Sequence, residues 1–62
     1  MDTVYISYEN FMILTSGTNP AALEAAIEEM QEGKNYIMES DNANFRIILG
    51  EDGNLQIGEQ IL

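Results

Sequence analysis

The chain contains no cysteine and no histidine, and its only basic residues are Lys34 and Arg46. Without cysteine, neither a disulfide framework nor a thiolate zinc site can supplement the core. Nothing indicates an oxidising compartment, so we expect a cytoplasmic protein. The commonest general base and the commonest thiol nucleophile are also missing, and Lys34 is the only side-chain amine. We therefore expect no enzymatic activity.

Recognisable ligand-binding motifs are scarce as well. Asp52-Gly53-Asn54 begins like a calcium loop, but its twelfth position would fall beyond Leu62. There is no glycine-rich phosphate loop, and the shortage of basic residues argues against direct binding of DNA or RNA. The longest run of large apolar residues, Phe11 to Leu14, is too short for a membrane span or a signal-peptide core. We expect no metal, no cofactor and no nucleic-acid or membrane partner.

Acidic residues, in contrast, are abundant. Eleven Asp and Glu against two Lys and Arg give a net charge of -9 over 62 residues. Such a field repels nucleic acid and anionic membranes and attracts basic surfaces. Solubility alone is a second explanation, although a charge of roughly 2–8 satisfies that need in a small domain. The 45% hydrophobic content is that of a folded chain, which we expect to form one domain over residues 1–62.

A helix over roughly residues 20–32 is the strongest structural signal. Asn19 is suited to cap it, Pro20 suits its first turn, and Gly33 suits the left-handed position after its end. One face of this helix is apolar at helical spacing and is expected to pack on a sheet. Its members are Leu23, Ala26, Ile27 and Met30.

The rest of the chain is expected to form strands. Residues 3–8 alternate as a strand does, and residues 11–16 are expected to continue as a second strand after a tight turn at Glu9-Asn10. One long bent strand is the alternative. Residues 35–40 and 45–49 predict two more strands, the latter with Phe45, Ile47 and Leu49 inward. A hairpin at residues 50–53 leads to a fifth strand from residue 54, with a bulge expected at Gly58.

The expected fold class is therefore α+β with the order ββαβββ. An antiparallel or mixed sheet is packed on one face by a single helix. One helix leaves the second face of the sheet uncovered, so we expect either a sheet curled on itself or a homodimer. The residues expected to point away from the helix are Tyr5, Met12, Leu14, Ile37 and Ile48.

The carboxylates of the helix form the main candidate site. Glu24, Glu28 and Glu32 are four residues apart, so they rise about 6 Å per step and present three charges along roughly 12 Å. This spacing imitates one strand of a phosphate backbone. The predicted turns at Glu9 and at Glu51-Asp52 are expected to lie at the same end as the helix C-terminus. Together with Glu29 and Glu32 they would form a curved acidic ridge that Lys34 interrupts. A solvated helix face is the alternative explanation.

In size, acidity and lack of cysteine and histidine, the chain resembles the small DNA-mimic inhibitors of phages and other mobile elements, the anti-CRISPR and anti-restriction proteins. The resemblance is one of overall character and involves no motif, so it assigns no role to any residue. It implies a non-enzymatic inhibitor in the host cytoplasm that occupies the basic nucleic-acid-binding surface of a defence nuclease or surveillance complex. The alternative is a small acidic adaptor, antitoxin or structural subunit that binds through an apolar sheet face.

Overall fold

The computed structural model of the protein describes residues 2–61. Over these residues the chain forms, in order, β1 (Thr3–Ser7), α1 (Tyr8–Thr15), α2 (Pro20–Gln31), β2 (Asn35–Glu39), β3 (Asn44–Leu49) and β4 (Leu55–Gln60). The strands form one sheet in the order β1-β2-β3-β4. β1 and β2 are parallel, whereas β3 is antiparallel to both of its neighbours. The predicted α+β class is confirmed, and the sheet is of the mixed type.

The second predicted strand is wrong, because the segment that follows β1 directly is helix α1. Neither the Glu9-Asn10 hairpin nor the long bent strand exists, and residues 2–61 form two helices where one was predicted. Ser7 caps α1: its backbone is extended (φ -75°, ψ 162°), and its side chain accepts a hydrogen bond of 3.1 Å from the Asn10 backbone N–H. An apolar run such as Phe11 to Leu14 fits a central strand and a buried helix equally well, so this cap and the packing of Phe11 decide between them.

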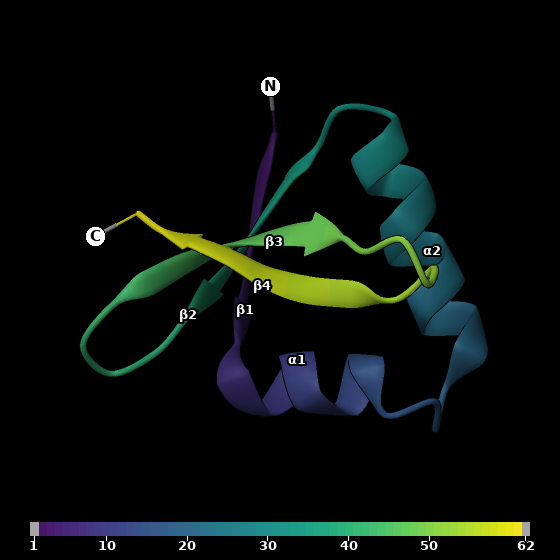
Figure 1. Cartoon of the computed structure of the whole chain (residues 1–62), viewed down its shortest axis with the longest axis horizontal. Coiled ribbons are helices and arrows are strands. Elements are labelled where there is room, and N and C mark those ends of the chain that lie inside the picture. The colour runs from purple at the N-terminus through teal and green to yellow at the C-terminus, as the bar shows by residue number, and fades with distance from the viewer. Residues whose placement is uncertain (1, 62) are drawn as a thin grey trace.

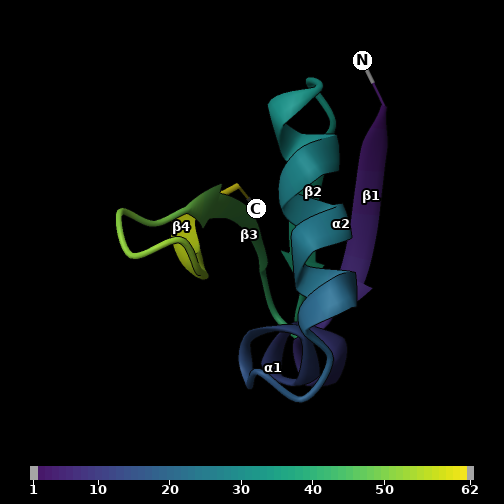
Figure 2. The ribbon, with the colours of Figure 1, turned by 90° about the vertical axis from the view of Figure 1, so that its right-hand side faces the viewer.

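The two helices occupy different positions around the sheet. α2 runs alongside β1 and β2 on one face, and α1 lies across the foot of α2, at the end where β1 finishes (Figures 1 and 2). β3 and β4 form a twisted ribbon that extends away from the other two strands (Figure 2). The core lies where these elements meet. Its buried side chains are Phe11 from α1, Ala26 from α2, Tyr36 and Met38 from β2, Ile47 from β3 and Leu55 from β4.

The β3–β4 hairpin forms where it was predicted, but Leu49, which was expected to be inward, is 41% exposed. Its turn follows Gly50, and Gly53 adopts the left-handed conformation with φ 82°. The pairing register shifts by one residue between Phe45 and Ile47, so that Gly58 and Glu59 of β4 lie opposite the single residue Arg46. The irregularity expected at Gly58 is present, and there an added Cβ would come within 3.1 Å of the Arg46 carbonyl oxygen.

The outer face of the sheet, defined here as the side turned away from α2, carries Tyr5, Ile37 and Ile48. These three residues point away from the helices as predicted, and Tyr5 is 56% and Ile48 40% exposed. Met12 and Leu14 were expected on the same face, and that expectation is wrong because both belong to α1. Leu14 packs against the core, whereas Met12 is exposed on the helix surface.

Candidate partner-binding surface

The ends of α2 are fixed by local hydrogen bonds. The Asn19 side chain accepts a bond of 3.2 Å from the Ala22 backbone N–H, and Pro20 occupies the first turn. At the other end, Gly33 has φ 104° and donates to the Met30 carbonyl, while the Lys34 N–H reaches back to the Glu29 carbonyl. This is a Schellman motif, which requires a left-handed residue and therefore favours glycine. Because both ends are fixed, α2 presents its side chains in a defined arrangement.

The acidic row, as we call Glu24, Glu28 and Glu32, lies on the exposed side of α2. Glu24 and Glu28 are within the helix, and Glu32 is its C-cap residue. Over residues 2–61, none of these three carboxylates forms an ion pair. α2 has no basic residue in its last turn, so neighbouring members of the row repel each other without a cation between them. The predicted row is therefore a solvent-facing series of negative charges.

Glu29 belongs to a different environment from the row. Its carboxylate accepts a hydrogen bond of 2.9 Å from the Tyr36 hydroxyl, and Lys34 Nζ lies 3.6 Å from its other oxygen. Burial, and then the hydrogen bond and negative charge of Glu29, raise the pKa of the Tyr36 hydroxyl above its ordinary value of 10.0. Glu29 thus links α2 to β2 and does not extend the acidic row.

Both basic side chains are occupied by carboxylates of the same chain. Lys34 pairs with Glu29, and Arg46 Nε lies 3.2 Å from Glu59 Oε1. These contacts are exposed or half-exposed, so each contributes little to stability. They do matter for the surface potential, because neither cation forms an ion pair with a member of the acidic row. Within the part of the chain that the structure describes, the three carboxylates of the row consequently have no ion-pair partner.

The remaining predicted acids do not form one ridge with the end of α2. Glu9 lies in the first turn of α1, beyond the end of β1, whereas Glu32 precedes the start of β2. Since β1 and β2 are parallel and in register from Thr3↔Asn35 to Ser7↔Glu39, these two acids lie at opposite ends of a strand pair about 13 Å long. The predicted placement of Glu9 beside the helix C-terminus is wrong, because it assumed a hairpin.

Glu51 and Asp52 are exposed in the β3–β4 turn. Asp52 accepts a hydrogen bond of 3.1 Å from the Asn54 backbone N–H, and the Asn54 side-chain amide donates to the Thr15 carbonyl at 3.3 Å. This second bond joins the turn to the C-terminal end of α1, which leads to the N-terminus of α2. The turn is therefore tethered on the side away from the C-terminus of α2, and the continuous ridge is not formed.

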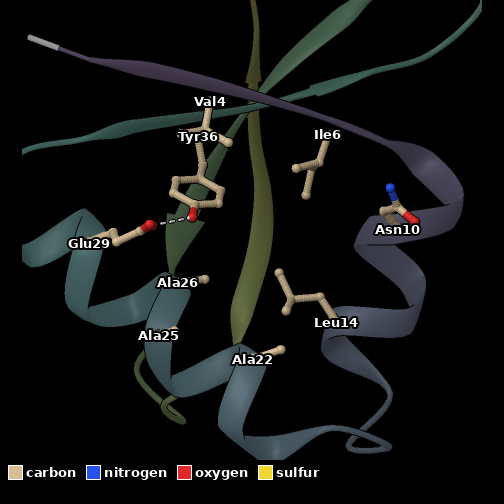
Figure 3. Close-up of a pocket in the computed structure, with 9 residues that line it drawn as sticks. All are labelled: Val4, Ile6, Asn10, Leu14, Ala22, Ala25, Ala26, Glu29 and Tyr36. Carbon is tan, nitrogen blue, oxygen red and sulfur yellow. Dashed lines mark hydrogen bonds between the residues drawn. The ribbon is translucent and has the colours of Figure 1, made fainter.

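A groove that sequence reasoning missed lies between β1, α1 and α2 (Figure 3). Its volume is about 360 Å³. Six of its nine lining residues are aliphatic, three of them alanines of α2, and the polar members include Glu29. The sequence did contain one signal for it. Ala22, Ala25, Ala26 and Glu29 recur at helical spacing, which gives α2 a stripe of small side chains ending in a carboxylate.

Other kinds of site find no support in the described part of the chain. Among residues 2–61, no group of three or more Asp or Glu side chains is placed to hold a metal ion. None of the helices described is both long enough and apolar enough to span a membrane. The acidic row and the groove are two features with a defined geometry that a partner can recognise.

Comparison with known proteins finds no relative of this chain. No protein-family model, no curated protein and no solved structure matches the chain.

Proposed function

We propose that the protein is a non-enzymatic inhibitor that binds the basic nucleic-acid-binding surface of a host defence nuclease or surveillance complex in place of DNA. The observation that carries the proposal is the acidic row. Glu24, Glu28 and Glu32 are exposed along one side of a capped helix, and none of them forms an ion pair within the described chain. Helical geometry spaces these carboxylates about 6 Å apart, a distance comparable to that between successive phosphates along a strand.

The charge distribution supports a protein partner with a basic surface. Lysine and arginine side chains that bind phosphates also bind carboxylates, with short charge-assisted hydrogen bonds. The net charge of -9 speeds association with such a surface and opposes contact with nucleic acid itself. The protein should therefore compete with DNA for a partner without binding DNA.

The test begins with capture of a partner. The immobilised protein is incubated with a bacterial lysate at low salt, and a retained protein that is released by added duplex DNA is identified and purified. Its affinity is then measured for the wild type and for the variant Glu24→Gln, Glu28→Gln, Glu32→Gln, which preserves side-chain shape and helix propensity. Loss of three exposed charge pairs should weaken binding by roughly 10–100-fold. The wild-type affinity should fall steeply as salt is added.

A matched control separates the acidic row from net charge. The variant Asp2→Asn, Glu39→Gln, Asp41→Asn also removes three exposed acids, but all three lie outside α2. It should retain affinity within a few-fold of the wild type. Equal losses of affinity in the two triple variants would show that binding depends on net charge alone. Full affinity of the α2 variant would refute the proposed role of the acidic row. Binding of the wild type to duplex DNA would contradict the decoy mechanism.

A second candidate function is favoured by the outer face of the sheet. Tyr5 and Ile48 are large apolar residues left exposed there, and Tyr8, Met12 and Ile13 are exposed on α1. Large apolar groups that stay exposed are typical of a surface that binds another chain. The protein would then be an interaction subunit, and a second copy of the same chain is one partner that fits. Binding of this kind should persist at high salt and survive neutralisation of the acidic row.

A further inference from the structure

The groove between β1, α1 and α2 has the chemistry of a side-chain receptor. We propose that it receives an arginine side chain of the partner protein, with the aliphatic stem on the apolar walls and the guanidinium at the carboxylate of Glu29. This proposal rests on the proposed function insofar as the partner presents a basic surface. It adds a specific anchoring position that the acidic row by itself does not supply.

The walls suit an aliphatic stem. Val4 and Ile6 of β1 face Ala22 and Ala25 of α2 across the groove, and Leu14 of α1 closes one side (Figure 3). The alanine side chains are short, so a ligand can approach the helix backbone closely. A volume of about 360 Å³ lies in the lower part of the range of roughly 300–1,000 Å³ that small-ligand sites occupy. The groove is open to solvent, since Ala25 is exposed, and a side chain can enter it from outside.

The charged end of the groove selects a cation. One Glu29 oxygen accepts a hydrogen bond of 2.9 Å from the Tyr36 hydroxyl, and the other lies 3.6 Å from Lys34 Nζ. A carboxylate offers about four acceptor positions, so these two contacts leave room for further donors. The Lys34 contact is longer than a hydrogen bond, and both side chains are about one-third exposed, so Lys34 is a weak competitor.

Arginine fits this combination better than other side chains. A neutral apolar side chain would cover the carboxylate without binding it, and an anion would be repelled. The lysine ammonium is compact and strongly hydrated, whereas the guanidinium is planar, less hydrated and able to donate two hydrogen bonds to one carboxylate. The Tyr36 ring also lines the groove, and its hydroxyl holds the Glu29 carboxylate there (Figure 3).

The direct test uses butylguanidinium, which carries the guanidinium group of arginine on an alkyl chain one carbon longer than the arginine side chain. Its titration into the folded protein should shift the NMR signals of the Ala22, Ala25 and Leu14 methyl groups, and the shifts should saturate at millimolar concentration. Butylammonium should bind more weakly, and butanol should bind without preference for the groove. Shifts that fail to saturate, or that butanol reproduces equally, would overturn the proposal.

Two substitutions of similar size separate the groove from the rest of α2. Ala25→Leu fills the groove at an exposed helical position and should weaken butylguanidinium binding at least tenfold. Ala21→Leu changes an exposed alanine of the same helix that does not line the groove, and should leave binding unchanged. Equal binding by both variants would contradict the assignment of the site.

The charged end is tested by two further variants. Glu29→Gln keeps an acceptor for the Tyr36 hydroxyl but removes the charge, and should weaken binding about tenfold. Lys34→Gln removes the competing cation and should strengthen binding about threefold. If Lys34 does not compete for the Glu29 carboxylate, its replacement should bring no gain in affinity. The Lys34 variant therefore tests whether Glu29 binds the guanidinium even if the Glu29 variant folds poorly.

The outcomes for the groove and for the acidic row are independent. The triple glutamine variant of the row should bind butylguanidinium as the wild type does, whatever its affinity for the captured partner. Conversely, Ala25→Leu should weaken the binding of the captured partner while leaving the acidic row intact. If Ala25→Leu no longer binds butylguanidinium but keeps full affinity for the partner, the partner does not use the groove. The proposal that the groove receives an arginine of the partner is then wrong.

Discussion

The Tyr36 hydroxyl donates a hydrogen bond of 2.9 Å to the Glu29 carboxylate, and this bond ties β2 to α2 at the polar end of the groove. Tyr36 is buried in the core, whereas Glu29 remains partly exposed. The hydrogen bond therefore joins the interior of the protein to its surface. Its strength depends on the protonation state of the tyrosine, which allows it to be measured by varying pH.

Replacing Tyr36 with phenylalanine should lower the free energy of unfolding by about 1 kcal/mol at neutral pH. The raised pKa of Tyr36 means that the folded state favours the protonated hydroxyl. Its contribution is complete below the unfolded value near 10 and is lost as pH rises through the higher folded value. Urea unfolding between pH 7 and pH 11 should show a steeper alkaline decline for the wild type than for Tyr36→Phe. Parallel declines would show that the bond contributes nothing.

Neutralising the acidic row should stabilise the isolated protein. Two neighbouring pairs in the row repel by a few tenths of a kcal/mol each, so the triple glutamine variant should gain about 0.5 kcal/mol at low salt. The gain should shrink as salt screens the charges, and wild-type unfolding midpoints should rise in moderate salt. Thermal melts of both proteins at low salt and at ~0.5 M salt measure this difference. A wild-type midpoint that falls with added salt would contradict the repulsion.

Phe11 should be essential for folding, whereas its neighbour Met12 should not. Phe11 is 6% exposed and packs in the core, so Phe11→Ala should cost about 3–5 kcal/mol, a large part of the stability of a domain this small. Met12 is 49% exposed on α1, and Met12→Ala should change stability by about 0.5 kcal/mol or less. Far-ultraviolet circular dichroism during urea unfolding compares the two variants. Similar losses would contradict the helical placement of this segment.

If a second copy covers the outer face, light scattering should give twice the monomer mass. The dimer should be favoured by salt, because each copy carries a net charge of -9. Ile48 is 40% exposed, so Ile48→Lys should abolish the dimer and leave a folded monomer. Leu14 is unsuitable for this test because it packs against the core. A wild-type protein that stays monomeric at high concentration and high salt would refute the dimer hypothesis.

Local signals in the sequence were sufficient for α2 and for the C-terminal hairpin. Asn19, Pro20 and Gly33 act through hydrogen bonds and backbone angles within a few residues, and the helix that they predict runs from Pro20 to Gln31. Gly50 and Gly53 act in the same way for the hairpin. The exposed row of carboxylates on α2 follows from helical spacing once the helix is known.

Helix α1 and the groove depend on contacts between distant segments, and the sequence does not display those contacts. The run from Phe11 to Leu14 has no periodicity that separates helix from strand, and Ser7 becomes a recognisable cap only when the helix after it is known. The error at this segment then moved Glu9 to the wrong end of the molecule and suggested a continuous ridge. The groove requires residues from four elements, so the alanine stripe of α2 could indicate it only in part.

The parallel pairing of β1 with β2 predicts an order for folding. Each residue of β2 pairs with a residue of β1 that lies 32 positions earlier in the chain, whereas β3 and β4 are joined by a short turn. Closing the longer loop costs more chain entropy before any contact compensates for it. The hairpin and α2 should consequently form early, and β1 should dock last. Val4 and Ile6 line the groove, so we expect the groove to be completed only at the final step of folding.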